Sequence, residues 1–197
     1  MLVVAACSST TAPAAAPTTS GDREPVVVAN NGGSREGHTP WGFAGMGTGL
    51  FAGDNLNPSF PEGDGVQIFL TFELPDAVLD ATSVALASDA LSVAGSPFED
   101  LGALIAEVVS YDAFGPSLFG IPGLSDPADC TRVDATGLQC DVSEIVSPLL
   151  AGGDTTVQLR LKFERPADND GRPDLAMFFR SDSNTNEPGL FTLTIGR

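Results

Sequence analysis

The sequence predicts an all-β fold, an antiparallel β-sandwich of the jelly-roll-like kind with one short helix. Short segments in which apolar and polar residues alternate favour this class, and 22 glycines and 15 prolines divide the chain into many turns. The length of 197 residues is sufficient for one hydrophobic core and a tail. We therefore expect a single domain over residues 25–197.

The N-terminus is similar to the processing signal of a bacterial lipoprotein. Val4-Ala5-Ala6-Cys7 resembles a lipobox, in which small residues precede the cysteine that receives the lipid. Residues 1–7 are too few for a charged region and a full apolar region, so we expect a truncated signal. Residues 8–24 have little to bury and predict a disordered tether. The alternative is an unanchored protein in which Cys7 occurs by chance.

The first predicted strand covers residues 25–29, and Asn30-Asn31-Gly32-Gly33 is expected to end it. The following stretch, up to residue 65, is rich in Gly, Asn and Pro and also carries large aromatic residues. It is either a long loop system or a set of short strands. Residues 66–74 alternate clearly and predict a strand. Two further predicted strands, whose alanines also suit a helix, are residues 82–88 and 103–112.

Cys130 and Cys140 are the two cysteines that remain once Cys7 is assigned to the lipid. Two cysteines this close in an exported chain are expected to form a disulfide, here across a polar turn. Closing so short a loop contributes about 2–3 kcal/mol in the chain-entropy model. A zinc site is disfavoured, because neither cysteine has another thiol or a histidine near it in the sequence.

A capping-box pattern predicts the helix, residues 142–150, with Asp141 accepting from the N3 amide and Glu144 reaching back. Apolar residues then recur at helical spacing, and Gly152-Gly153 provide the stop. Residues 156–163 alternate strictly and predict a strand that turns Gln158, Arg160 and Lys162 toward water. The last two predicted strands are residues 175–181 and 190–195.

Four segments occur in an informative order: a strand at 67–75, a strand with Val84-Ala85-Leu86, a helix start at Asp141-Val142-Ser143, and a closing pair at 176–181 and 188–195. In this order, residues 66–195 resemble the DNRLRE-type and carbohydrate-binding-module-like β-sandwich modules of exported bacterial and archaeal proteins. The resemblance implies a jelly-roll-like sandwich that attaches to polysaccharide or cell-envelope glycan. It assigns no binding residue, since the shared positions are mostly core positions.

An acidic segment at residues 168–174 places Asp168, Asp170 and Asp174 around a glycine. The spacing resembles the calcium loops of thrombospondin type 3 repeats, and hard oxygen donors suit Ca²⁺. These three aspartates are therefore candidate ligands of a structural calcium ion. The alternative is a plain hairpin turn, because the segment lacks a bidentate glutamate at EF-hand spacing and Asn-Asp-Gly is ordinary turn chemistry.

Three aromatic residues are candidates for stacking on sugar rings. Trp41, the only tryptophan, lies with Phe43 in a Gly-rich segment near His38, and Tyr111 is a weaker candidate. The alternative is burial: Trp41 and Phe43 would then cover an edge of the sandwich, and Tyr111 would join the core.

Composition and motifs limit the functions that the chain can have. Nine Lys+Arg against 26 Asp+Glu give a net charge of −17, which opposes nucleic-acid binding, because that binding relies on cations that neutralise phosphates. Contact with a membrane is expected through the lipid anchor only, since no segment approaches the length of a spanning helix. His38 is the only histidine and no Gly-x-Ser-x-Gly motif occurs, so catalysis has little support beyond a residual glycoside-active enzyme.

The sequence therefore predicts an extracytoplasmic protein, either a membrane-anchored lipoprotein or secreted. Its expected role is that of a non-catalytic binding module for cell-envelope or environmental glycans. The alternative is a structural or assembly lipoprotein that binds another envelope protein through a sheet edge.

Overall fold

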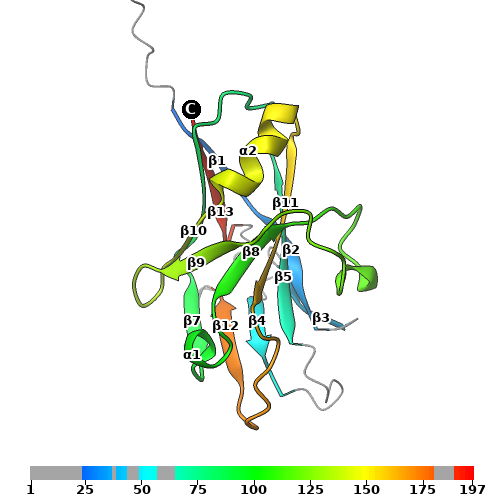
Figure 1. Ribbon diagram of the computed structural model, residues 1–197, viewed down its shortest axis with the longest axis vertical. Helices are drawn as coiled ribbons and strands as arrows, with labels where there is room; N and C mark the ends of the chain where they lie inside the picture. The colour runs from blue at the N-terminus through cyan, green and yellow to red at the C-terminus, as the bar shows by residue number, and fades with distance from the viewer. Residues whose placement is uncertain (1–23, 37–38, 44–48, 57–64, 180–188) are drawn as a thin grey trace, which may run out of the picture.

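The computed structural model describes residues 24–36, 39–43, 49–56, 65–179 and 189–197 (Figure 1). The predicted signal, with Cys7, and nearly all of the predicted tether lie outside these residues. The strands are β1 (Val26–Ala29), β2 (Asn31–Glu36), β3 (Thr39–Phe43), β4 (Leu50–Asp54), β5 (Val66–Glu73), β6 (Ser83–Ser88), β7 (Leu91–Ala94), β8 (Leu104–Val108), β9 (Ala128–Arg132), β10 (Leu138–Asp141), β11 (Thr156–Phe163), β12 (Asp174–Phe178) and β13 (Thr192–Gly196). The helices are α1 (Pro97–Asp100), α2 (Ser143–Gly152) and the 3₁₀ turn η1 (Pro116–Leu118).

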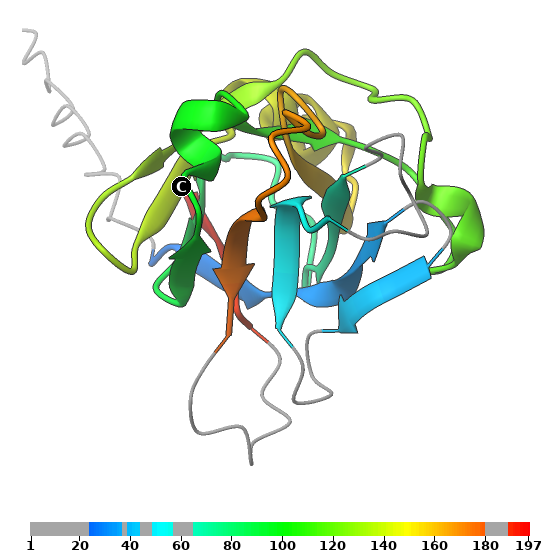
Figure 2. The ribbon, with the colours of Figure 1, turned by 90° about the horizontal axis from the view of Figure 1, so that it is seen from below.

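The strands form one antiparallel sheet with the order β1-β13-β6-β10-β9-β8-β11-β5-β4-β12-β7, and β2 pairs with both β5 and β3. The sheet curls on itself, so that strands from its two ends face each other across the interior (Figures 1 and 2). The predicted all-β antiparallel sandwich is confirmed. The four-residue helix α1 was not expected.

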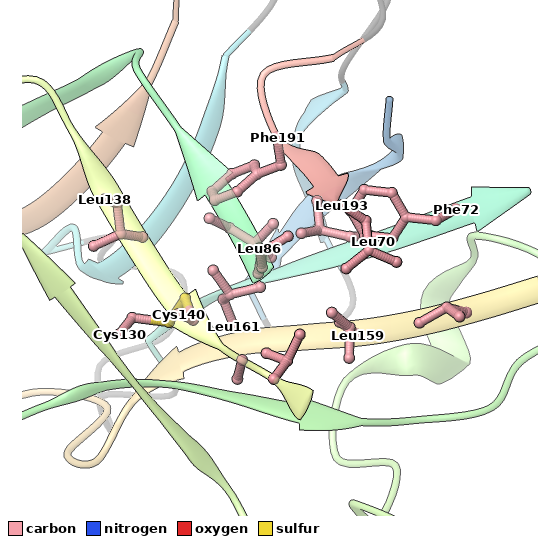
Figure 3. Close-up of a cluster of buried hydrophobic side chains, with 14 of the residues drawn as sticks. Leu70, Phe72, Leu86, Cys130, Leu138, Cys140, Leu159, Leu161, Phe191 and Leu193 are labelled. Carbon is pink, nitrogen blue, oxygen red and sulfur yellow. A yellow bond between two sulfur atoms is a disulfide. The ribbon is translucent and has the colours of Figure 1, made fainter. Parts of the chain in front are cut away.

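One apolar core fills the space inside the curled sheet. Phe178 of β12 and Phe191, just before β13, bring their ring centroids to 4.6 Å, which joins opposite ends of the strand path. Leu159 and Leu161 of β11 are fully buried in the same cluster, as the alternation of this strand predicts (Figure 3). A single core therefore serves strands from both ends of the strand path.

The Gly-rich stretch after β1 forms short strands rather than a long loop. The first strand does end where expected, since β1 stops at Ala29, but strand pairing resumes at once, because β2 begins at Asn31 and pairs with β5 over six residues. Gly32 has a φ of 139°, and a Cβ there would collide with the backbone of Phe69 on β5. Glycine at this position thus allows close strand pairing, although glycine alone usually signals a break.

Asn30 forms the corner between β1 and β2. Its side chain is buried, and its Oδ1 accepts from Phe191 N at 2.7 Å, while its own N donates to Phe191 O at 3.1 Å. The chain passes at this residue from pairing with β13 to pairing with β5. A single polar side chain therefore fixes the point at which the chain changes its pairing partner.

Helix α2 covers one end of the sandwich, but it does not begin with the predicted capping box. The N-cap is Val142, without a side-chain capping bond. Asp141 is the last residue of β10, and its Oδ1 accepts from the N and the Oγ of Ser143 at 3.0 and 2.6 Å. Its carboxylate is thus occupied in closing a turn. The predicted stop is confirmed, since Gly153 has a φ of 91° and donates to the last turn.

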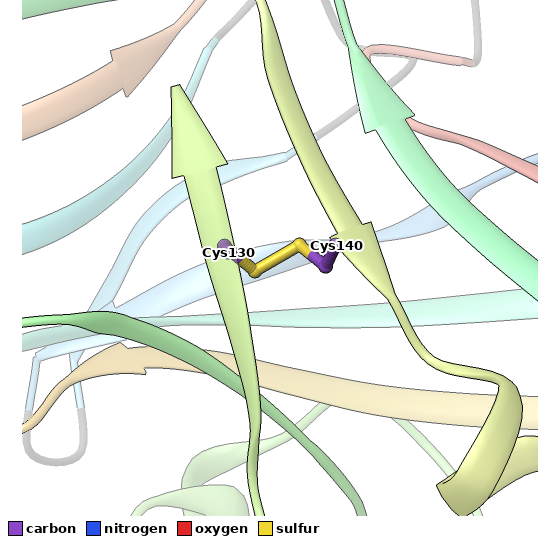
Figure 4. Close-up of a disulfide and its surroundings, with 2 residues drawn as sticks. All are labelled: Cys130 and Cys140. Carbon is purple, nitrogen blue, oxygen red and sulfur yellow. A yellow bond between two sulfur atoms is a disulfide. The ribbon is translucent and has the colours of Figure 1, made fainter. Parts of the chain in front are cut away.

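Cys130 and Cys140 form a disulfide between β9 and β10 (Figure 4). The two residues lie opposite each other in the register of this hairpin, with 4.2 Å between their Cα atoms. The predicted pairing is confirmed. Between the two cysteines the chain turns at residues 133–137, with strand on either side of the turn.

Candidate functional site

The acidic segment of residues 168–174 contributes two carboxylates to a cluster that also contains Asp100. One carboxylate oxygen from each of Asp100, Asp168 and Asp174 lies within 4.8 Å of the other two. We call these three residues the acidic cluster. Asp170 is outside it, and its Oδ1 accepts from the backbone N of Arg172 at 2.7 Å. The structure thus brings together two of the three predicted calcium ligands and adds one from α1.

The electrostatics of the acidic cluster favour a cation. The pKa of Asp100 is raised by partial shielding from water and then by the charges of Asp174 and Asp168, with smaller contributions from neighbouring carboxylates. Asp174 is buried, and its Oδ1 accepts from Ser96 N at 2.5 Å, which fixes this oxygen in place. Oxygen donors of this kind suit Ca²⁺. Calcium binding stays a prediction.

The aromatic candidates are distributed over different parts of the fold. Trp41 and Phe43 belong to β3, whose backbone pairs with β2, but their side chains lie outside the described residues, as does His38. Tyr111 packs edge-to-face against Phe69, and its hydroxyl lies 2.8 Å from Thr71 Oγ1. Burial raises the pKa of Tyr111 to about 12. Tyr111 is therefore packed within the protein, which was the alternative to sugar stacking.

Residues 109–125, which we call the strap, follow β8 (Figure 1), pack against Phe69 on the outer face of β5 and contact Arg160 on the outer face of β11. Phe69 of β5 and residues of the strap form a small apolar cluster separate from the main core. The strap is held at its ends, where Leu124 N donates to Val108 O at 2.8 Å and Tyr111 N donates to Gln158 Oε1 at 2.9 Å. The apolar strap residues of this cluster are Val109, Tyr111, Phe114, Leu118 and Ile121.

The strap corrects the expectation that Arg160 faces water. Arg160 is only 4% exposed, and its Nε donates to Glu107 Oε1 at 2.7 Å. Its Nη1 donates to the strap carbonyl of Ile121 at 2.7 Å, and Lys162 Nζ lies 2.8 Å from the same carboxylate oxygen. Burial acts to raise the pKa of Glu107, but the hydrogen bonds and charges of Lys162 and Arg160 outweigh it, so this pKa is lowered.

A groove of about 320 Å³ opens beside the strap, at the end of the outer face where β5 begins and β11 ends. A Cβ on Gly65, which has a φ of 68°, would collide with Pro166, so glycine allows the two walls to approach. The groove is lined by Gly53, Gly65, Val66, Gln67, Phe119, Lys162, Phe163, Glu164, Arg165 and Pro166.

The polar chemistry of the groove centres on Gln67 of β5. The Oε1 atom of Gln67 is shielded from solvent and has no hydrogen-bond partner within the described residues. Buried polar atoms usually have a partner, so an unsatisfied amide in a groove marks a place for a ligand group or a water. The half-buried ring of Phe119 and the side chain of Lys162 lie along the same groove. The arrangement offers an amide, a ring and a cation to one ligand.

The sequence did not indicate the groove, and it indicated the acidic cluster without Asp100. The alternation of residues 66–74 does place Gln67 on the face opposite the core, but nothing local indicates that Phe119 meets it there. Asp100 follows a glutamate in a short helix, and no spacing relates it to Asp168 or Asp174. Both sites depend on contacts between segments that are distant in the chain.

No protein-family model matches the chain, and no curated protein matches it either. The resemblance of residues 66–195 to DNRLRE-type and carbohydrate-binding-module-like modules stays a prediction. Among the helices of the described residues, none combines the length and the apolar character that crossing a membrane requires.

Proposed function

We propose that this protein is an extracytoplasmic, non-catalytic module that binds a cell-envelope or environmental glycan in the groove beside the strap. The observation that carries the proposal is the shielded Oε1 of Gln67, which has no partner within the described residues and lines a groove with an aromatic ring. Sugars combine hydroxyl groups, which satisfy an amide, with apolar ring faces, which pack on Phe119. A groove of about 320 Å³ is within the size range of small-ligand sites.

The carboxylates near the groove support binding rather than glycoside hydrolysis. Glycosidases place two carboxyl groups on either side of the scissile bond. Glu164 is the one carboxylate among the described residues that line the groove, and its Oε2 accepts from Ala103 N at 3.0 Å. The buried Glu107 is engaged by Arg160 and Lys162. We therefore propose association without turnover.

Export and anchoring belong to the same proposal. The Cys130–Cys140 disulfide supports a compartment outside the reducing cytoplasm. Attachment of lipid to Cys7 would then keep the binding domain at the membrane surface. The test is mass spectrometry of the chain expressed in a bacterium with a complete lipoprotein signal joined ahead of Val4-Ala5-Ala6-Cys7, because residues 1–7 alone are too short for export. We expect a lipid adduct that a Cys7→Ser variant of the same protein lacks.

The glycan proposal is tested by a glycan array and then by calorimetry with the sugars that bind. We expect Gln67→Ala to weaken binding about tenfold, because a hydroxyl loses its amide partner. The matched control is Gln139→Ala, which removes an exposed glutamine of β10 that does not line the groove. Equal affinities for both variants and the parent protein would contradict a sugar site at the groove.

A second candidate role, assembly with another envelope protein, is favoured by the edge of the sheet at β7. This strand ends the strand path and has one paired neighbour, β12, within the described residues. Phe179 and Val133, which are 45% and 58% exposed, provide apolar surface. Exposed strand edges are common sites of strand addition. Co-purification with an envelope protein that Phe179→Ser abolishes would support this role.

A further inference from the structure

We infer that the groove selects an acidic sugar, one that carries a carboxylate or a sulfate, over the corresponding neutral sugar. This inference rests on the proposed glycan-binding function and specifies the ligand class. It arises from the distribution of positive charge in a chain that has a net charge of −17. Two of the nine basic residues, Lys162 and Arg165, line the groove, and Glu164 is the one carboxylate among its described lining residues.

The ion network behind the groove leaves a surplus positive charge. Oε1 of Glu107 accepts from Nε of Arg160 and also contacts Nη2 of Arg160 at 2.5 Å and Nζ of Lys162 at 2.8 Å. One carboxylate thus faces two cations. Arg160 is buried, whereas the side chain of Lys162 is 31% exposed and lines the groove. The unbalanced charge is therefore accessible from the groove side.

Arg165 supplies the second cation, and its backbone is held in place. Its N donates to Leu101 O at 3.0 Å, and the preceding residue, Glu164, donates to Ala103 O at 3.0 Å. The guanidinium of Arg165 is exposed and has no hydrogen bond or ion pair within the described residues. A guanidinium presents paired N–H donors that match the oxygens of a carboxylate or sulfate. Arg165 is thus suited to the acidic group, and Gln67 to a hydroxyl.

The charge of the whole chain restricts the ligand further. At physiological ionic strength the Debye length is about 8 Å, so the groove residues act on a bound group while distant carboxylates are screened. A densely charged polymer would extend beyond the groove and meet the negative surface. We therefore expect a sparsely charged or short acidic glycan rather than a polyphosphate.

The test compares the full chain on matched oligosaccharides. One set contains oligomers of galacturonate, glucuronate and mannuronate with their carboxyl-reduced counterparts, and a second set contains sulfated galactan oligomers with their desulfated counterparts. We expect at least one acidic oligomer to bind about tenfold more tightly than its neutral counterpart. The two sets distinguish a carboxylate from a sulfate as the recognised group.

The control variants separate local charge from total charge. Arg165→Gln is expected to reduce the preference for the acidic oligomer about tenfold. Arg172→Gln removes an equal charge from an exposed arginine of the same connection, one that does not line the groove, and is expected to leave the preference unchanged.

Three results would overturn the inference in different ways. Equal binding of acidic and neutral oligomers that Gln67→Ala still weakens would remove the charge selectivity and leave the glycan site. Absence of binding to both sets and to an array of neutral glycans would overturn the inference together with the proposed function. An equal loss of preference in Arg165→Gln and Arg172→Gln would assign the effect to total charge and not to the groove.

Discussion

The two faces of β11 differ in how they are shielded from water. The inner face, with Leu159 and Leu161, is buried in the main core, as alternation predicts. The outer face carries Gln158, Arg160 and Lys162, yet the strap covers it and buries Arg160. Alternation therefore tells which side chains share a face, but a segment elsewhere in the chain decides whether water reaches that face.

Among the changes considered, a substitution on the inner face of β11 is expected to lower stability most. Leu159→Ala should lower the free energy of unfolding by about 3 kcal/mol, because it removes buried apolar volume and leaves a cavity. Urea denaturation of the parent and variant measures the change. A loss below about 1 kcal/mol would mean that the sandwich core is less tightly packed than the structure shows.

A substitution on the outer face of β11 is expected to cause the next largest loss of stability. Arg160→Met should cost about 2 kcal/mol, since Glu107 stays buried with Lys162 as its one remaining cation and Ile121 O loses a donor. The control Lys162→Met should cost about 0.5 kcal/mol, because Lys162 is partly exposed and Glu107 keeps Arg160. Equal, small losses in both would show that the covered face behaves like an open surface.

The acidic cluster, like the outer face of β11, is formed by segments that are distant in the chain, and we expect Ca²⁺ to stabilise it. At a Ca²⁺ concentration about ten times the Kd, binding to the folded state should add about 1.4 kcal/mol. Thermal unfolding with millimolar Ca²⁺ and with EDTA measures this gain. Asp100→Asn should abolish it, whereas Asp170→Asn, outside the cluster, should retain it. A gain that depends on Asp170 instead would restore the ligand set that the sequence spacing suggests.

The smallest expected effect is a change of stability with pH on the outer face. The pKa of Glu107 lies below its ordinary value of 4.5 in the folded protein, because Lys162 and Arg160 stabilise the carboxylate. The contribution of the Glu107 carboxylate to stability is therefore complete at pH values above its ordinary pKa of 4.5 and is lost as the pH falls through the lower pKa of the folded protein. The stability difference between the parent and Glu107→Gln, measured from pH 7 to about 3, should shrink at low pH. A constant difference would contradict the role of charge.

Local patterns were sufficient to predict the strands whose side chains alternate. β5 and β11 were predicted almost to the residue, because each has one buried face and strong alternation. β2 was not located within the Gly-rich stretch, where a loop and short strands both stayed open, because Gly32 and Gly33 suggest a break. The pairing of these glycines with β5 depends on a strand that lies far along the chain. Glycine at a close approach and glycine at a turn look alike in sequence.

The candidate sites were less predictable, because they are made by residues that no local pattern relates. The spacing of Asp168 and Asp174 indicated an acidic site, but the third member, Asp100, comes from α1. Strand alternation placed Gln67 outward without indicating the groove that Phe119 and Arg165 complete. Asp141 shows that a local pattern can also mislead: it fits a capping box, but its carboxylate closes a turn at the end of β10.

The corner at Asn30 also determines how the domain would bear mechanical load. Within the described residues, β1 forms strand pairs with β13 alone, over four residue pairs, and its first residue, Val26, pairs with Ile195. A pull on the residues before β1 would open these pairs one after another from Val26. At Asn30 the opening meets two hydrogen bonds to Phe191 and then a strand paired on both sides. We therefore expect β1 to yield first, as a short extensible link, with loss of the packing of Val26 and Val28 against the core, while the strand pairing beyond Asn30 is kept.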